Sequence, residues 1–174
     1  MSLTALLRMM HVLAVVLYLG GGIMLHFSVR RALHSVPPAQ AAILSSRIGT
    51  HFTGISWAAL TLWGVSGYVM LSRNGLADFG SPWTLFIESS LLGTGLGTAM
   101  LVMIGGWYVL LVNALIITFV LRPRFAERIE PDEGEERVQQ ISTRIGEAAR
   151  WIDVLAVANL VVAAAAFVAA KVYY

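Results

Sequence analysis

The sequence predicts an all-α integral membrane protein whose four helices form an up-down-up-down bundle. Hydrophobic residues make up 57% of its 174 residues, charged residues 13%, and the mean hydropathy is +0.75. A soluble domain carries roughly 25% charged residues. The chain also contains four long uncharged runs. About 20 apolar residues cross a bilayer core of ~30 Å, and a lone segment in lipid must satisfy its own backbone groups, so each run is expected to be a helix.

The four predicted spans belong to a single domain that covers residues 1–174. They lie at roughly 7–30, 48–72, 92–121 and 151–172. Short connections between helices favour antiparallel neighbours in sequence order. Glycines and alanines recur along the spans, and small residues let helices approach one another closely in a membrane. The lipid bilayer is therefore the first partner that the sequence predicts.

The first two connections carry turn and helix-start signals. Pro37-Pro38 precedes the second span, and because proline suits the first turn of a helix, that helix is expected to begin near Ala39. The second connection contains Asn74-Gly75 and Gly80-Ser81-Pro82-Trp83, which are turn signals. The aromatic and apolar residues from Trp83 to Ile87 predict a short piece lying on the membrane surface.

The third connection, residues 122–150, is the only long polar stretch. Apolar residues recur in it at helical spacing, at Val138, Ile141, Ile145 and Ala148. This periodicity predicts that the fourth helix extends out of the membrane.

The basic residues predict an orientation. Nine of the twelve lie in or beside the first and third connections, whereas Arg8, Arg73 and Lys171 lie on the opposite side. Arginine and lysine are enriched in cytoplasmic loops, so these two connections are expected to be cytoplasmic, with both termini outside an inner membrane. Because the basic residues adjoin apolar spans, they do not indicate a nucleic-acid partner.

Three histidines occupy the ends of the first two spans. His11 and His26 are fifteen residues apart, which corresponds to ~60° of rotation and ~22 Å of rise, so they share a face at opposite membrane boundaries. His26 stands four residues before Arg30, and His51 stands four residues after Arg47 on the antiparallel second span. The sequence therefore predicts that His26 and His51 lie at the same depth.

Two histidines at one depth on neighbouring helices are suited to ligate a six-coordinate b-type haem from both faces. Gly22 and Gly54, one turn from these histidines, are expected to leave room for the macrocycle. Arg30 and Arg47, together with Arg31, are placed to pair with haem propionates. The sequence thus predicts His26 and His51 as axial ligands.

Other roles remain open for the same residues. An interfacial histidine often serves a structural role, and this reading stands beside ligation for His26 and His51. His11 has no histidine partner at its own boundary, so a second haem, a quinol or proton contact, and a structural role are all open for it. Asn113 and Asn159 lie inside the third and fourth spans and are expected to bond across helices. The chain has no cysteine, which excludes thiolate sites.

Three segments resemble copper-resistance D-like and HemJ-like membrane proteins. They are HVLAVVLYLGGGIML in the first span, SRIGTHFTGISWAALTLWGVSGYVML in the second, and LVNALIITFVLRPRF at the end of the third. The resemblance implies a four-helix fold and, for HemJ-like members, b-type haem bound through the first-helix histidine, here His11, and oxidation of protoporphyrinogen. Copper-resistance D-like members are associated with copper passage. The HemJ-like pattern also has a lysine in the third helix, whereas the one lysine of this chain is Lys171.

Three functions follow as expectations. The first is a haem-binding electron-transfer protein, a subunit of a respiratory or redox complex with other membrane subunits or a quinol or cytochrome partner. The second is a non-catalytic accessory subunit of a larger membrane complex. The third is copper transport, for which the chain offers Met9-Met10-His11. No catalytic residue is assigned.

Overall fold

A computed structural model describes residues 2–75, 95–126 and 135–172, and within these ranges it contains helices and turns and no strand. The all-α prediction is therefore confirmed. The predicted surface piece at Trp83–Ile87 lies outside the described residues. The elements in chain order are α1 (Leu3–Ile23), η1 (Met24–Val29), α2 (Arg30–Leu33), α3 (Pro38–Arg73), α5 (Gly95–Leu115), η2 (Ile116–Leu121), η3 (Arg122–Ala126) and α6 (Glu135–Val172).

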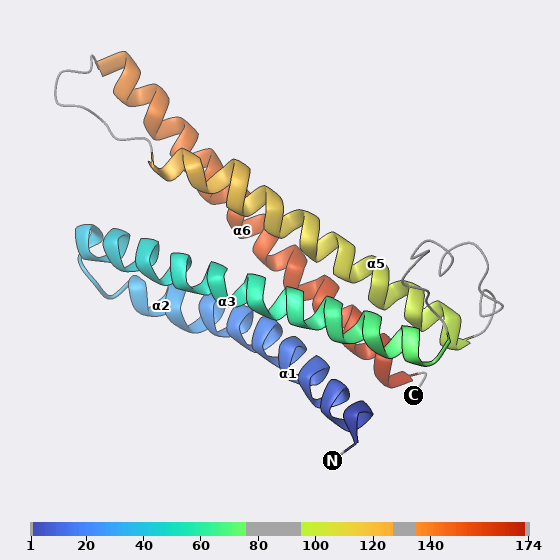
Figure 1. Ribbon diagram of the computed structural model, residues 1–174. Helices are drawn as coiled ribbons and strands as arrows, with labels where there is room; N and C mark the ends of the chain where they lie inside the picture. Colours follow the sequence, from blue (N-terminus) through green and yellow to red (C-terminus); the bar gives the residue numbers. More distant parts are fainter. Residues whose placement is uncertain (1, 76–94, 127–134, 173–174) are drawn as a thin grey trace.

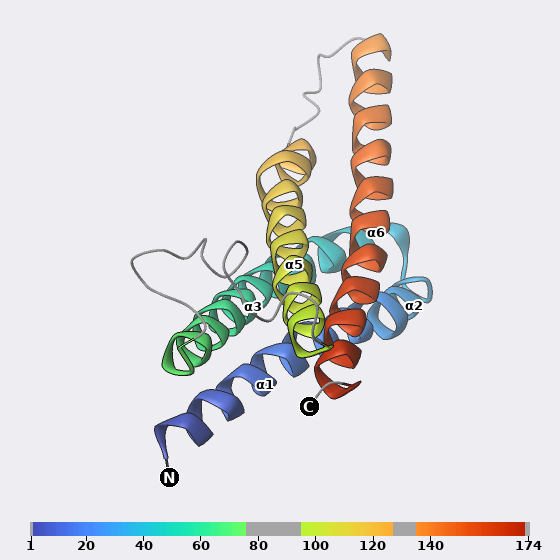
Figure 2. The same ribbon diagram turned by 90° about the vertical axis from the view of Figure 1, so that its right-hand side faces the viewer.

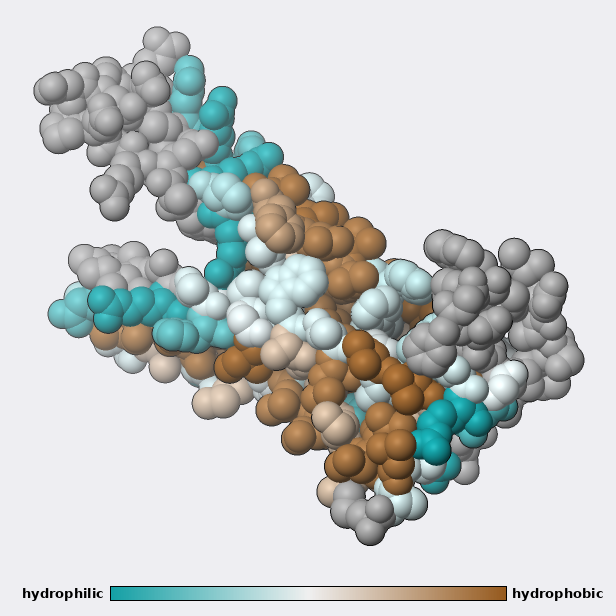
Figure 3. Space-filling view, viewed as in Figure 1, coloured by the Kyte–Doolittle hydropathy of each residue, from teal (hydrophilic) through white to brown (hydrophobic). Residues whose placement is uncertain are grey.

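Four helical stretches in the described part are long and apolar enough to cross a membrane: Leu3–Leu33, Arg47–Arg73, Gly97–Arg124 and Thr143–Ala169. Large apolar side chains cover their outer faces, and Phe119, for example, is 68% exposed. In Figure 3 hydrophobic residues cover the middle of the helices while hydrophilic ones gather near the ends. Such a surface is stable in contact with lipid, as expected of a multi-pass membrane protein.

The helices form two hairpins. α1 lies along α3, and α5 lies along α6, while α1–α6 and α3–α5 contacts join the hairpins (Figure 1). The hairpins meet near the middle of the bundle and diverge toward the end that holds α2 and the beginning of α6. The buried core lies where they meet, and its members are Ala14, Val15, Tyr18, Ala59, Leu60, Trp63, Leu110, Ala163 and Ala166.

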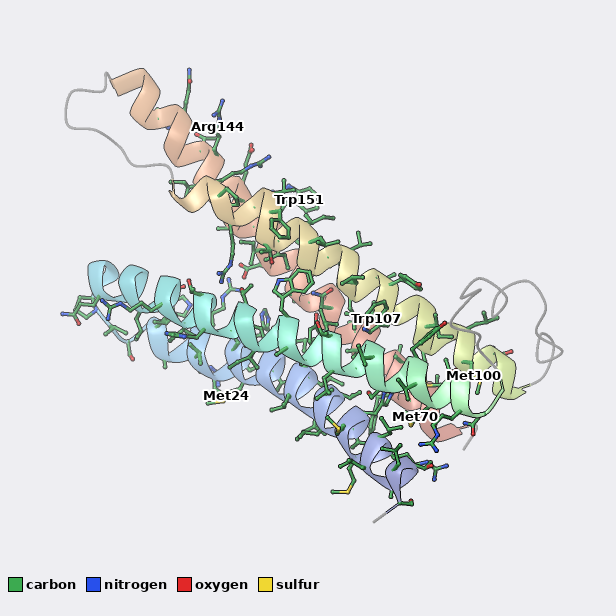
Figure 4. All side chains as sticks on the ribbon, viewed as in Figure 1. Met24, Met70, Met100, Trp107, Arg144 and Trp151 are labelled. Atoms are coloured by element: carbon green, nitrogen blue, oxygen red, sulfur yellow. The ribbon has the colours of Figure 1, made fainter. Side chains whose placement is uncertain are left out.

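A glycine fixes the contact between the hairpins at α3 and α5. A Cβ atom on Gly64 would lie 2.5 Å from Cζ2 of Trp107, so only glycine admits the indole ring at this distance. The Trp107 Nε1–H donates a hydrogen bond to the Leu60 carbonyl oxygen at 2.9 Å (Figure 4). The ring therefore lies against the backbone of α3 and binds it at the same point.

Two sequence predictions about helix boundaries are confirmed. α3 begins at Pro38, where a missing N–H costs no intrahelical hydrogen bond. α6 is 38 residues long, and Figure 2 shows that it continues well past the end of α5. Arg144 and Trp151, on this first half of α6, are both exposed (Figure 4). The segment before the fourth span, in which apolar residues recur at helical spacing, is thus part of the same helix.

The two hairpins repeat one local pattern, which the sequence reasoning missed. In each, the first helix passes into a six-residue π-helix, η1 or η2, and an arginine follows at once, Arg30 or Arg122. The second helices contain related stretches, Ser-Ser-Arg-Ile-Gly at 45–49 and Ser-Thr-Arg-Ile-Gly at 142–146. π-helical turns are rare and frequently mark functional sites. Equivalent positions in the two hairpins can therefore be compared directly.

The second hairpin has a polar pair in its interior. Asn113 Nδ2 donates to Asn159 Oδ1 at 2.7 Å between α5 and α6, which confirms the expected bond across helices. Asn159 is 9% exposed. An amide in an apolar interior needs such a partner because lipid offers none.

Replacing Asn113 with leucine is expected to lower the free energy of unfolding by about 0.6–2 kcal/mol, because Asn159 then loses its partner. Titration of the detergent-solubilised protein with a denaturing detergent measures this. Val112→Leu, at a half-exposed lipid-facing position, is the control and should change stability by less than about 0.5 kcal/mol. Equal effects of the two substitutions would show that the amide pair contributes nothing specific.

Candidate functional site

The structure gives His11 a hydrogen-bonding neighbour, Ser66 on α3, whereas the sequence offers no second histidine at that boundary. The half-buried His11 ring on α1 faces α3, and its Nδ1 lies 3.0 Å from Oγ of Ser66. A Cβ atom on the neighbouring Gly67 would lie 3.0 Å from Cε1 of the imidazole. Ser66 binds the ring, and Gly67 makes room for it.

Ser66 can orient the tautomer of His11. Its hydroxyl has a single hydrogen and lies within donating distance of two carbonyl oxygens of α3, that of Leu62 at 2.6 Å and that of Trp63 at 3.2 Å. If the hydroxyl donates within α3, it accepts from His11, whose proton is then on Nδ1. In that neutral tautomer Nε2 carries the lone pair.

An aromatic side chain packs against His11. The Trp63 ring meets His11 edge-on, with centroids 6.2 Å apart and planes at 83°. Tyr18 packs on Trp63 in turn, with ring centroids 6.4 Å apart. Trp63 and Tyr18 are 5% and 7% exposed. The buried Trp63 ring limits the rotation of the imidazole, and Tyr18 supports Trp63.

The described residues form no cluster of three or more metal-binding side chains at His11. Met9 and Met10, which precede it, are exposed on the outside of α1. Among the described residues, no group of three or more His, Cys, Asp or Glu side chains gathers to hold a metal ion. A metal at His11 would therefore have fewer than three such ligands from the described residues.

His26 lies in η1, half-buried, with its ring edge-on to Phe27 at 5.0 Å. Its neighbours one turn before and after face α6. A Cβ atom on Gly22 would lie 2.9 Å from Cδ2 of Leu160, and Arg30 forms an ion pair with Asp153 at 2.9 Å. These two contacts bear on the roles expected for Gly22 and Arg30.

The Leu160 side chain lies beside Gly22, so this glycine lets α1 and α6 approach. The Arg30 guanidinium pairs with a carboxylate of this chain at a half-exposed position. The roles expected for Gly22 and Arg30 at a haem stay predictions.

His51 is exposed on α3. The next residue, Phe52, packs against Gly21 of α1, and successive helical residues are rotated by about 100°, which turns His51 out of this contact. The described contacts thus direct His26 and His51 toward different surroundings, and their axial pairing stays a prediction. Gly54 has nothing within 4 Å of a built Cβ, and Arg47 is exposed.

Sequence reasoning missed Ser66 because it lies 55 residues from His11 in the chain. One signal was available, since Ser66 and Gly67 stand together near the end of the second span, at the same membrane boundary as His11. A hydroxyl and a glycine at the depth of a histidine on a neighbouring helix are typical of a hydrogen-bonded helix contact.

Comparison with known proteins gives no relative from which a role for these residues could be taken, because no family model, no curated protein and no solved structure matches the chain.

Proposed function

We propose that the chain is a membrane-embedded protein that binds b-type haem and takes part in electron transfer, with His11 as its best-prepared axial ligand. One observation supports this most strongly. The Nδ1 atom of His11 lies 3.0 Å from Oγ of Ser66, and the tautomer with its proton on Nδ1 leaves the lone pair on Nε2. Histidines that ligate metals in proteins almost always donate their other N–H in this way, since the bond fixes both the tautomer and the ring orientation.

The residues around His11 fit the proximal side of such a site. The buried Trp63 ring packs edge-on against the imidazole, and Gly67 admits it against α3. A bound haem would supply a one-electron redox couple whose potential responds to the axial ligand and to burial. The chain's own part is to hold the proton at Nδ1, to orient the imidazole and to keep water from its inner side. The predicted His26/His51 site at the other boundary remains the alternative.

A second candidate function is that of an accessory subunit in a larger membrane complex. Gly20, Gly54 and Gly105 have nothing within 4 Å of a built Cβ atom. Glycines on the outside of a membrane bundle let a further helix approach closely, which favours an assembly with other membrane subunits. The two functions are compatible, because haem subunits of redox complexes have both properties.

The proposal places the chain in an inner membrane with both termini outside. Its support is the excess of arginine at one end of the bundle, where α2, the beginning of α3 and η3 lie. In that orientation the His11 site lies at the outer boundary and the ion pair between Arg30 and Asp153 at the cytoplasmic one.

Absorption spectra of the purified protein test the proposal. Soret and α bands that sharpen on reduction are expected, together with a pyridine haemochrome assay that finds at least one haem per chain. Elemental analysis for iron and copper separates haem from the copper alternative. A colourless protein without iron would refute the haem proposal, and co-purification of other subunits with that colourless protein would favour the accessory function.

A further inference from the structure

Arg122 and Arg30 occupy equivalent positions with different surroundings. Each directly follows a π-helix at the same end of the bundle. Arg30 is paired with Asp153 at 2.9 Å. Arg122 is half-buried and reaches across to α3, where its Nη2 lies 3.0 Å from a Cβ built on Gly49. No carboxylate among the described residues pairs with Arg122, so its charge is not neutralised there.

Arg122 lies where the two hairpins diverge. Figure 3 shows a notch between the arm formed by α2 and the beginning of α3 and the arm formed by the end of α5 and by α6. α3 and η2 are joined by a hydrogen bond from Trp57 Nε1–H to Thr118 Oγ1 at 3.0 Å. The Arg122 side chain reaches α3 directly, since its Nη2 lies 3.0 Å from a Cβ built on Gly49.

An anion near Arg122 would stabilise its charge. Arg122 lies within the apolar stretch Gly97–Arg124, where an unpaired charge is costly. A guanidinium offers a planar fork of N–H donors that matches the oxygens of a phosphate, and phosphates are concentrated at the membrane boundary. Gly49, lacking a side chain, admits the Arg122 guanidinium itself against α3.

We propose that the notch between the hairpins, at Arg122 and Gly49, binds a phosphate group, supplied by a phospholipid headgroup or by free phosphate. The site is independent of haem and of the residues around His11. It also explains the asymmetry of the two hairpins, because the equivalent arginine, Arg30, is neutralised within the chain by Asp153.

Four variants isolate the charge from the shape of the site. Arg122→Gln removes the guanidinium, and Arg30→Gln is its matched control at the equivalent position. Gly49→Asp places a carboxylate of the chain beside Arg122, whereas Gly49→Asn adds a side chain of the same shape without charge. A Cβ at this position meets only the end of the flexible Arg122 side chain, so both Gly49 variants are expected to fold, which thermal melting checks.

The measurement is native mass spectrometry of protein extracted from vesicles of phosphatidylglycerol and phosphatidylcholine, followed by titration with inorganic phosphate. We expect bound phospholipid on the wild type, Arg30→Gln and Gly49→Asn, and about tenfold less on Arg122→Gln and Gly49→Asp. Retention of phospholipid against excess inorganic phosphate would identify the headgroup as the source. Displacement, or Arg122-dependent binding of inorganic phosphate to the delipidated protein, would identify free phosphate.

Two results would overturn the proposal. One is equal binding of phospholipid and phosphate by all variants. The other is equal loss in Gly49→Asp and Gly49→Asn, which would make shape rather than charge responsible. Loss of haem from Arg122→Gln with unchanged phospholipid binding would also count against it, since it would assign Arg122 to a propionate carboxylate. The haem assay on the wild type is separate, so failure of the proposed function leaves this test intact.

Discussion

His11→Ala is expected to remove the Soret band of the purified protein almost completely. The alanine has no nitrogen to replace Nε2, and Trp63, which packs against the position, offers no strong-field ligand. Imidazole added to the variant should restore part of the Soret absorbance, because the space vacated beside Gly67 fits the free ligand. Absorption spectroscopy with and without imidazole measures both effects.

Ser66→Ala serves as the positioning variant in the same experiment. It keeps the imidazole but removes the acceptor of its Nδ1 proton, so the tautomer is no longer fixed. Loss of such an outer hydrogen bond typically lowers metal affinity about 10–100-fold, so weakened haem retention is expected rather than complete loss. If Ser66→Ala acted only by changing helix packing, added imidazole would not change haem retention in this variant.

His26→Ala and His51→Ala provide the result that would contradict the assignment of His11 as the haem ligand. If His11→Ala keeps a normal spectrum while His26→Ala and His51→Ala each lose it, the axial pair predicted from equal depth is correct and the His11 assignment is wrong. If His11→Ala alone loses the spectrum, the first-helix histidine is the ligand, as the family resemblance implies.

Gly64→Ala is expected to destabilise the bundle by overpacking the contact between α3 and α5. The added Cβ would lie 2.5 Å from Cζ2 of Trp107, and the rigid indole must move to avoid it. Overpacking of this kind costs about 1–3 kcal/mol, and loss of the Trp107–Leu60 hydrogen bond adds about 1 kcal/mol. Alanine regains roughly 1 kcal/mol of helix propensity, so a net loss of about 1–3 kcal/mol is expected.

Gly105→Ala is the matched control for this prediction. Gly105 lies in α5 near Trp107, but a Cβ there has nothing within 4 Å, so only the gain in helix propensity remains. Denaturing-detergent titration should therefore show Gly105→Ala at least as stable as the wild type. Trp107→Phe, which removes the atoms that clash, should partly rescue Gly64→Ala. Failure of this rescue, or equal loss in both glycine variants, would contradict the close contact between α3 and α5.

Properties that depend on one chain segment at a time followed from the sequence. The apolar runs predicted the four helices, Pro38 predicted the beginning of α3, and the periodicity before the fourth span predicted the extension of α6. The bond between Asn113 and Asn159 was also predictable, because an amide inside lipid must find a partner on a neighbouring helix. Hydropathy and residue spacing determine how deep each residue lies in the membrane. These features depend on this depth and on the local sequence alone.

The directions in which side chains point required the tertiary structure. Depth alone paired His26 with His51, but the rotation of each helix about its axis is set by close contacts such as Gly21 with Phe52 and Gly22 with Leu160. The same contacts turned His11 toward Ser66. Which carboxylate neutralises which arginine was likewise decided by helices far apart in the chain, since Arg30 meets Asp153 across the bundle. A helix of nearly uniform hydrophobicity carries little information about which face it buries, so packing of small residues against large ones determines it.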